Sequence, residues 1–294
     1  MRLLVRLFNY GDDPFTKGRG MSGFKNIILA PFLILLSVLS YPIAVSAQNV
    51  HPVVDIETGC LLGGVAGGKW LEAEAIAPLI KGGERYRFYT LKGFAGKAVG
   101  AKVDPTGDPC GRSSNVTFEP EAKEGFAVDE RFNAMPRTPK MLSASDPAYR
   151  QMVAGILRSH GIRRPLVNIR QLLRIDLDGD GTDEVLVSAT HLAEGMGGAN
   201  RQMAVHSKPG DYSLVFLRKM VKGRAQNIIL SEDYHLRNND STPFQFRIAA
   251  VLDVNGDGKM EIIVHGDYYE GGGSTLYRLI GNKVKEMFGC SCGE

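Results

Sequence analysis

A short acidic segment occurs twice in this chain, each time between two runs of apolar residues. The first copy reads DLDGDG from Asp176 to Gly181, and the second reads DVNGDG from Asp253 to Gly258. Each copy leads into a β-branched run, EVLV in the first case and EIIV in the second, which is typical of a strand. Closely spaced carboxylates repel one another unless a cation compensates them. The repeated segment therefore constrains the fold to two similar strand–loop–strand units.

The similarity between the two copies extends beyond the acidic loops. The first unit begins at Val167 and the second at Phe244, and each continues past a glycine cluster into two further strand-like runs. These runs are YSLVFLRKM and NIILSEDYH in the first unit, and STLYRLI and KVKEMF in the second. An internal duplication explains the pattern, because each repeat would be one supersecondary unit. We therefore predict that residues 167–294 form two units of four antiparallel strands.

Alternate residues of each acidic loop carry oxygen atoms that are expected to point toward one centre. Side chains at positions 1, 3, 5 and 9, with a main-chain carbonyl at position 7, build a cage that suits calcium, a hard cation with flexible coordination. The glycines allow the positive φ angles that such a curl needs. The predicted metal ligands are Asp176, Asp178, Asp180, Thr182 and Glu184 in the first loop and Asp253, Asn255, Asp257, Lys259 and Glu261 in the second.

The loops differ from EF-hand loops, which need a bidentate glutamate at position 12, where this chain has Val187 and Val264. The pattern D-x-[DN]-G-D-G-x-x-E followed by an apolar strand instead resembles the calcium loops of FG-GAP and VCBS repeats. Those repeats form the blades of integrin-α-like propellers and occur in many secreted bacterial proteins. The resemblance covers about residues 167–290 and implies calcium at the ten positions, but no activity. Two units alone are too few to close a propeller.

The metal is expected to be structural. Without it the carboxylates of each loop repel one another at neutral pH, and calcium would remove that repulsion and pin the hairpin. We therefore expect one or two calcium ions, bound with the affinity of extracellular modules, about 0.1–1 mM.

The residues before the repeats predict an N-terminal β region, a linker and one helix. Residues 48–125 are glycine-rich, and ERYRFYTL within them alternates as a strand does. Residues 126–166 join a polar, proline-containing linker to a helix at about 146–160. Asp146 is a suitable N-cap, Pro147 fits the first helical position, and the apolar residues that follow have helical spacing. The whole chain is therefore predicted to be mainly β, within an α+β arrangement.

The N-terminus predicts export from the cytosol. An apolar run follows Lys25, and small residues occupy the two signal-peptidase positions, Val45 and Ala47. We therefore predict a signal peptide over residues 1–47 and a secreted or periplasmic mature chain. Residues 1–20 would be an extended n-region or an upstream start. An uncleaved membrane anchor is the alternative.

Four cysteines follow the predicted signal peptide: Cys60, Cys110, Cys290 and Cys292. In an exported protein an even number of cysteines indicates disulfides. Three connectivities are open, and Cys60–Cys110 with Cys290–Cys292 is favoured because each pair lies within one segment. A zinc site is disfavoured, because the paired C-x-x-C spacing is absent.

Neither H-E-x-x-H nor G-x-S-x-G occurs in the sequence. The stretch GGVAGGKW matches part of a phosphate-binding loop, but Trp70 replaces the serine or threonine that holds magnesium. The favoured function is therefore calcium-stabilised binding or scaffolding. The alternative is an envelope hydrolase with catalytic groups in residues 48–140 and the repeats as an accessory module. A third reading is a purely structural domain with no ligand beyond calcium.

The sequence limits the partner to a class. The predicted signal segment holds five basic and two acidic residues, so the rest of the chain has 30 of each, which argues against nucleic acid. Aromatic residues lie beside polar loops in YHLRNNDSTPFQF and DYYEGGGSTLY, as in a carbohydrate- or peptide-binding lip. We expect an extracellular protein or carbohydrate as the partner, and membrane contact only through an uncleaved signal segment.

Overall fold

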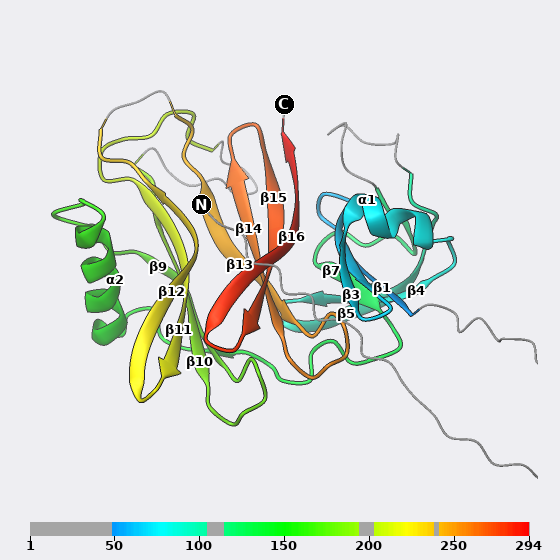
Figure 1. Cartoon of the computed structure of the whole chain (residues 1–294). Helices are drawn as coiled ribbons and strands as arrows, with labels where there is room; N and C mark the ends of the chain where they lie inside the picture. The colour runs from blue at the N-terminus through cyan, green and yellow to red at the C-terminus, as the bar shows by residue number, and fades with distance from the viewer. Residues whose placement is uncertain (1–48, 105–114, 194–202, 238–240, 294) are drawn as a thin grey trace, which may run out of the picture. The chain divides into compact units, whose positions relative to one another are not determined.

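The computed structural model describes residues 49–104, 115–193, 203–237 and 241–293, and its strands form three antiparallel sheets (Figure 1). This confirms the predicted mainly β class. The predicted signal peptide and Cys110 lie outside the described residues. Among the described residues, no helix has the length and apolar character needed to cross a bilayer.

The first sheet has seven strands in the order β3-β2-β1-β7-β4-β5-β6. A short helix α1 (Ala73–Ile76) and a 3₁₀ turn (Ala77–Leu79) follow β3. Apolar side chains from this helix, from the turn and from one face of the sheet form a separate core cluster. The strands are β1 (Val50–Asp55), β2 (Cys60–Ala66), β3 (Lys69–Glu72), β4 (Arg85–Thr90), β5 (Gly93–Gly100), β6 (Phe118–Glu119) and β7 (Phe126–Asp129).

Strand β7 changes the expected boundary of the N-terminal region. The sequence assigned residues 126–166 to a linker and a helix, but β7 lies in the middle of the first sheet, where it pairs with β1 and β4. The segment after it is also packed, since Ala134 and Met135 are buried in the main core. The sequence concealed this role because β7 has only four residues, all of them buried, and a polar, proline-containing segment follows it.

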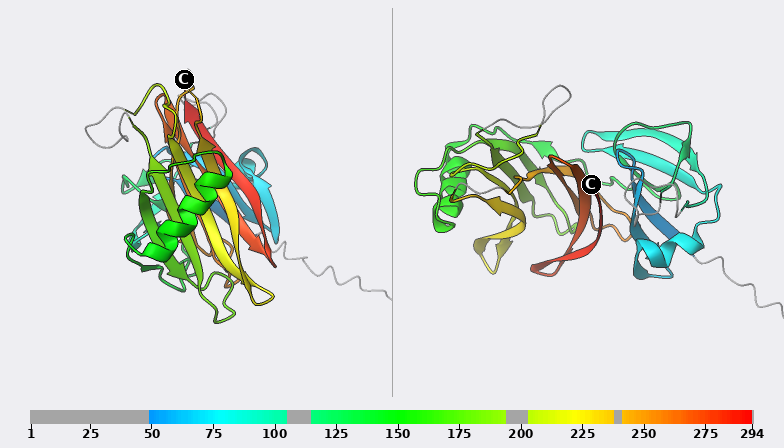
Figure 2. Two further views of the ribbon diagram at one scale, coloured as in Figure 1. Left: turned by 90° about the vertical axis from the view of Figure 1, so that its left-hand side faces the viewer. Right: turned by 90° about the horizontal axis from the view of Figure 1, so that it is seen from above.

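The predicted helix at about 146–160 is confirmed as α2 (Pro147–Ser159). The Asp146 carboxylate accepts a hydrogen bond from the backbone N–H of Ala148 at 2.9 Å, which caps the first turn. Val153 and Leu157 are buried against the second sheet, and Figure 2 shows α2 lying across that sheet.

The second and third sheets are each built around a meander of four consecutive antiparallel strands. The second has the order β12-β11-β10-β9-β8 and the third the order β13-β14-β15-β16. That the two meanders arose by duplication stays a prediction. The strands are β8 (Lys140–Met141), β9 (Ile169–Ile175), β10 (Glu184–His191), β11 (Tyr212–Val221), β12 (Arg224–Tyr234), β13 (Gln245–Leu252), β14 (Glu261–Tyr268), β15 (Gly271–Ile280) and β16 (Lys283–Gly293).

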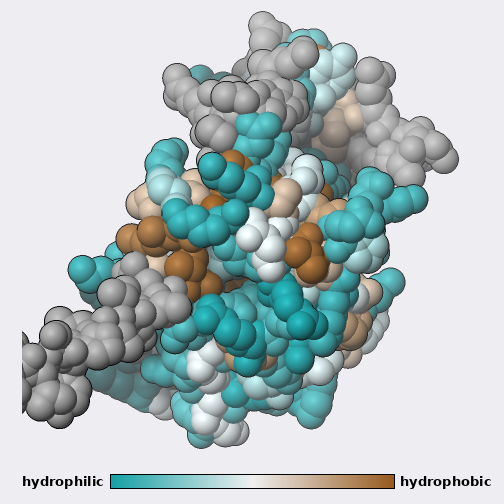
Figure 3. Space-filling view, turned by 90° about the vertical axis from the view of Figure 1, so that its right-hand side faces the viewer, coloured by the Kyte–Doolittle hydropathy of each residue, from teal (hydrophilic) through white to brown (hydrophobic). Residues whose placement is uncertain are grey.

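Alternation along the strands divides the side chains between two cores. In β10, Val185 and Val187 belong to the cluster under α2, whereas Leu186 belongs to the main core. The main core also takes Val53 from β1 and Phe288 from β16. The first sheet and the two meanders therefore share one hydrophobic core. In the face shown in Figure 3, hydrophobic side chains gather only in small patches between polar ones.

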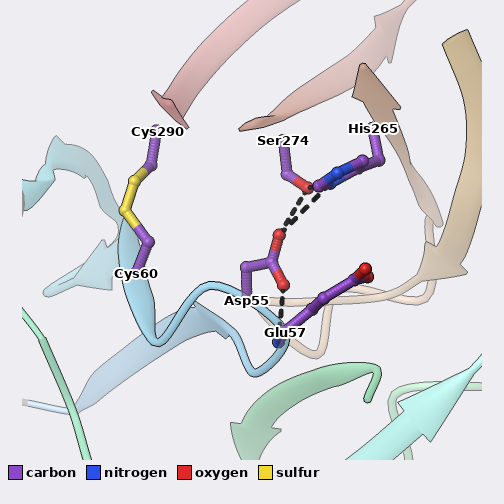
Figure 4. Close-up of a disulfide and its surroundings, with 6 residues drawn as sticks. All are labelled: Asp55, Glu57, Cys60, His265, Ser274 and Cys290. Atoms are coloured by element: carbon purple, nitrogen blue, oxygen red, sulfur yellow. Dashed lines mark hydrogen bonds and ion pairs between the residues drawn. A yellow bond between two sulfur atoms is a disulfide. The ribbon is translucent and has the colours of Figure 1, made fainter. Parts of the chain in front are cut away.

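The disulfide differs from the expected pairing. Cys60 in β2 bonds to Cys290 in β16, with Cα atoms 6.4 Å apart (Figure 4), so the predicted pairings Cys60–Cys110 and Cys290–Cys292 are both wrong. Proximity in sequence misled the prediction, because β16 packs beside β2 although 230 residues separate the two cysteines. The side chain of Cys292 lies outside the described residues.

Removing this disulfide is expected to destabilise the protein. The bond closes a long loop in the unfolded chain, so the double variant Cys60→Ser/Cys290→Ser should lose about 2–5 kcal/mol of unfolding free energy. Urea unfolding followed by circular dichroism measures the loss. Treatment of the variant with dithiothreitol serves as the control for the remaining cysteines. An unchanged midpoint in the double variant would contradict the assigned pairing.

Candidate functional site

The two acidic loops connect the first two strands of each meander. The first loop (residues 176–183) joins β9 to β10, and the second loop (residues 253–260) joins β13 to β14. Each makes its turn with two glycines at positive φ, with angles of 77° and 86° in the first loop and 75° and 82° in the second. The expected conformational role of the glycines is therefore present in both loops.

The aspartate at position 1 organises the backbone of each loop. The carboxylate of Asp176 accepts hydrogen bonds from the backbone N–H groups of Gly179, Asp180 and Gly181 at 2.7–3.2 Å. The carboxylate of Asp253 accepts hydrogen bonds from the four backbone N–H groups of residues 255–258 at 2.6–3.3 Å. Both oxygens of each aspartate thus hold the turn. This is a structural role, whereas the sequence predicted only metal coordination for these two residues.

Positions 5 and 7 bond to each other locally. The backbone N–H of Thr182 donates to Asp180 at 2.7 Å, and that of Lys259 donates to Asp257 at 3.0 Å. In the first loop, ligand atoms of Asp176, Asp178 and Glu184 lie within 4.8 Å of one another, so three of the five predicted residues converge. Asp180 is outside this cluster.

The glutamate at position 9 is buried in both loops. Glu184 accepts from the N–H of Leu177 at 2.9 Å, and Glu261 accepts from the N–H of Val254 at 3.1 Å, so each closes its loop. Burial raises the pKa of Glu184, and it raises the pKa of Glu261, which is 0% exposed, to about 8. Each buried carboxyl therefore needs a nearby positive charge to ionise readily at neutral pH.

A basic residue on the third strand of each meander faces that glutamate. The register pairs Val185 with Arg218, which brings the neighbouring Lys219 over Glu184. The Lys219 ammonium, only 7% exposed, donates to Glu184 at 2.8 Å and to Asp178 at 3.0 Å. Sequence reasoning missed this residue. The available signal was a basic side chain inside an apolar strand.

The second meander has the matching arrangement with an arginine. The register pairs Ile262 with Tyr277 and so brings Arg278 over Glu261. The guanidinium hydrogen-bonds to Asp257, and its Nε lies 3.6 Å from Oε1 of Glu261. The ring of Trp70, in β3, lies 4.9 Å from the guanidinium carbon. The two loops are therefore compensated by cations of the chain itself.

Two buried carboxylate oxygens still have no hydrogen-bond partner among the described residues. They are Oδ1 of Asp178 in the first loop and Oε1 of Glu261 in the second. An unpaired buried oxygen of this kind is costly. One such atom in each loop fits a divalent cation with oxygen ligands, and the donor sets match the chemistry that calcium prefers.

The two loops lie side by side and are clamped by Arg137. Its guanidinium donates to the carbonyls of Asp176 at 2.6 Å and Leu177 at 3.1 Å in the first loop, and to that of Gly258 at 2.7 Å in the second. The N–H of Met260 also donates to the carbonyl of Leu177 at 2.8 Å. A change in either loop is therefore felt by the other.

A groove of about 710 Å³ lies beside the third sheet. Its lining comes from all four strands of that sheet, from Ser231 in β12 and from Glu72 in β3. Phe244 and Phe246 stack with centroids 5.4 Å apart and planes 4° apart, and Tyr268 lies 5.2 Å from Phe244. The two aromatic segments that the sequence singled out are thus brought together in one groove.

A serine, a histidine and two aspartates meet beside the disulfide, but they do not form a catalytic triad. Ser274 donates to Asp55 at 2.7 Å, and Nδ1 of His265 lies 2.8 Å from the Ser274 hydroxyl (Figure 4). Nε2 of His265 lies 3.1 Å from Asp267. Ser274 and His265 are 1% and 2% exposed, so no substrate reaches the hydroxyl.

The charge state of His265 also argues against a role as general base. Burial alone lowers its pKa, but hydrogen bonds to Asp267 and Asp55 outweigh burial and raise the pKa to about 9. The imidazolium is therefore the stable form at neutral pH, and it ties β14 to the aspartate of β1. The network is a buried ion pair between the first and third sheets.

The region that the hydrolase alternative relies on shows a similar ion pair. His51 lies 2.9 Å from Asp129, and Arg131 also bonds to that carboxylate. Burial opposes ionisation of Asp129, but His51 and Arg131 together lower its pKa to about 2. In the described part of residues 48–140, no hydroxyl or thiol is hydrogen-bonded to His51. The stretch around Trp70 is the β2–β3 hairpin.

Comparisons with protein-family models, with curated proteins and with solved structures found no match to this chain. The resemblance to FG-GAP and VCBS repeats thus rests on the loop residues alone, and the function has to be argued from the site.

Replacing Lys219 by methionine should expose the cost of the buried carboxylates. In excess chelator we expect a loss of about 3–5 kcal/mol in unfolding free energy, because Glu184 and Asp178 lose their shared cation. Urea unfolding measures the change. Lys285→Met, at an exposed position of β16, is the control and should change the value by less than about 0.5 kcal/mol. Equal losses in both variants would contradict the assigned role.

The His265 network should make stability fall at alkaline pH. The pKa of His265 is about 9 in the folded chain against its ordinary value of 6.5, so its contribution is complete below pH 6.5 and is lost as pH rises through 9. The contribution is at most on the order of 3 kcal/mol. Urea unfolding at several pH values, compared between the natural chain and His265→Gln, isolates it. His160→Gln, at an exposed site, should retain the natural slope.

Proposed function

We propose that this chain is a calcium-stabilised binding protein that acts outside the cytosol, with the groove beside the third sheet as its ligand site. The observation that carries the proposal is the groove itself, where Phe244 and Phe246 meet Tyr268, which comes from another segment. Concave sites with an aromatic wall and a few polar groups are the usual form of ligand sites. The disulfide supports a location outside the cytosol, where such bonds persist.

A binding role is favoured over catalysis by the state of the titratable groups. His265 is held as a buried imidazolium and His51 is engaged by a carboxylate with a strongly lowered pKa. Neither supplies a base next to an accessible nucleophile. The groove contains carboxylates, aromatic rings and hydroxyls but no histidine, lysine, arginine or free thiol among its lining residues.

Calcium would serve as a structural ion in this proposal. In the first loop the ligand atoms of Asp176, Asp178 and Glu184 converge within 4.8 Å of one another, and each loop has one buried carboxylate oxygen without a hydrogen bond. In the second loop Asn255, Asp257 and Glu261 would hold an ion in competition with Arg278, with Asp253 shaping the loop around it. In the first loop Asp178 and Glu184 would hold an ion in competition with Lys219. Bound calcium would supply the positive charge that the buried carboxylates need, and it would join the loops that Arg137 already clamps.

Calcium is expected to raise the melting temperature. With 10 mM calcium against excess chelator and an affinity of about 0.1–1 mM, each occupied loop should gain about 1–3 kcal/mol. Differential scanning calorimetry measures the gain. The double variant Asp178→Asn/Glu261→Gln keeps the shape of both side chains but removes one charge from each loop, and it should lose the calcium response. Aspartates 176 and 253 are unsuitable for this test because they hold the backbone turns.

Asp183→Asn is the matched control for the calcium experiment. Asp183 lies in the first loop, but its carboxylate is 3.0 Å from Arg174 and is not among the predicted ligands. This variant should respond to calcium as the natural chain does. A natural chain whose melting temperature is the same in calcium and in chelator would overturn the calcium part of the proposal. That result would not bear on ligand binding in the groove, which is measured separately by titration.

A further inference from the structure

The charged side chains that line the groove are all acidic. Two carboxylates line it, those of Glu72 in β3 and Glu286 in β16. Both residues are exposed, and within the described part of the chain neither carboxylate is occupied by a hydrogen bond or ion pair. No lysine, arginine or histidine is among the lining residues. An anionic ligand would therefore meet repulsion without compensation.

The aromatic residues of the groove offer a flat apolar surface, in contrast to the two carboxylates. The ring of Phe246 covers Gly266, since a Cβ at that glycine would come within 2.7 Å of the ring. Phe244 stacks on Phe246 and remains 38% exposed. Any larger residue at 266 would push the pair away from the sheet. The glycine thus sets a flat, accessible aromatic face at one end of the groove.

Small polar residues continue the groove beyond the aromatic pair. Thr275 and Ser231 contribute hydroxyls to the lining. Ser231 is linked to the Tyr277 hydroxyl at 3.2 Å, which ties the edge strand β12 to β15. Gly273 and Gly289 also line the groove. A ligand here would meet an apolar face, hydroxyls and carboxylates.

We propose that the groove binds a neutral oligosaccharide, an inference that rests on the proposed binding function. One face of a pyranose ring presents C–H groups that cover an aromatic ring, while its hydroxyls point outward. Free carboxylates are strong acceptors for such hydroxyls, and these hydrogen bonds are charge-assisted. The groove offers both features with no cation to attract an acidic sugar. Its volume of about 710 Å³ lies within the range of small-molecule sites.

A cationic peptide is the competing ligand that the two carboxylates would also attract. The neutral sugar is favoured because the carboxylates are accompanied by a stacked aromatic face and by hydroxyls. In addition, the edge of β16 already packs beside β2 and β3, so that strand does not offer a free edge for an extended peptide. The experiment below treats a peptide as an outcome that would overturn the proposal.

The test uses the complete mature chain in 10 mM calcium and isothermal titration calorimetry. The neutral probes are cellotriose, maltotriose, mannotriose and the trimer of N-acetylglucosamine; trigalacturonate is the anionic probe and trilysine the cationic one. We expect at least one neutral trisaccharide to bind and trigalacturonate not to bind. Phe244→Ala and Glu286→Gln should each weaken the bound sugar about tenfold or more. Phe94→Ala, an aromatic residue that is 58% exposed outside the groove, is the matched control and should bind normally.

The outcomes separate this inference from the proposed function. Binding of trilysine with no neutral sugar bound would overturn the sugar assignment while leaving a binding groove. Absence of binding by every probe, in a chain whose melting temperature calcium raises, would overturn the inference and leave calcium stabilisation intact. Sugar binding that Phe244→Ala and Glu286→Gln leave unchanged would place the sugar elsewhere and equally overturn it. The melting temperatures of these surface variants confirm that they are folded.

Discussion

Two buried glutamates impose the constraint on which the C-terminal half of this protein depends. Glu184 and Glu261 begin the second strand of their meanders, and a carboxylate removed from water must be compensated by nearby donors and cations. Each one accepts a backbone N–H from its own loop and faces a basic residue on the next strand along the chain. A slip of one residue in either register would move Lys219 or Arg278 to the other face of its sheet. The buried charge thus specifies register as well as loop conformation.

The same need for compensation links the parts of the fold to one another. Arg137 holds both loops through three backbone carbonyls, and Trp70 of the first sheet covers Arg278 of the third. Asp55 of β1 meets His265 and Ser274 inside the protein, close to the disulfide between β2 and β16 (Figure 4). These polar contacts are highly specific, because a buried charge tolerates few alternative partners. They join the first sheet to the meanders in addition to the shared hydrophobic core.

The groove follows from this construction. Its walls are strands of the third sheet together with Glu72 from the first and Ser231 from the second, so it exists only when the three sheets are assembled. His51 and His265, the histidines closest to a catalytic arrangement in the described part of the chain, are instead engaged in ion pairs. A site of aromatic faces, hydroxyls and free carboxylates is suited to holding a ligand, and the acidic loops keep the surrounding strands in place. This arrangement of charges is the basis on which we propose binding supported by a structural ion.

The sequence by itself determined the mainly β class, helix α2 and the turns of both acidic loops. Those features depend on local physics: strand alternation, an N-cap at Asp146, and glycines at positive φ. It did not reveal Lys219, Arg278, Arg137, strand β7 or the partner of Cys60. Each of these is defined by a neighbour far away in the chain, and a single sequence carries no record of which distant strands pack together. Only the tertiary structure decided them, because compensation of a buried charge depends on distance in space and not on distance along the chain.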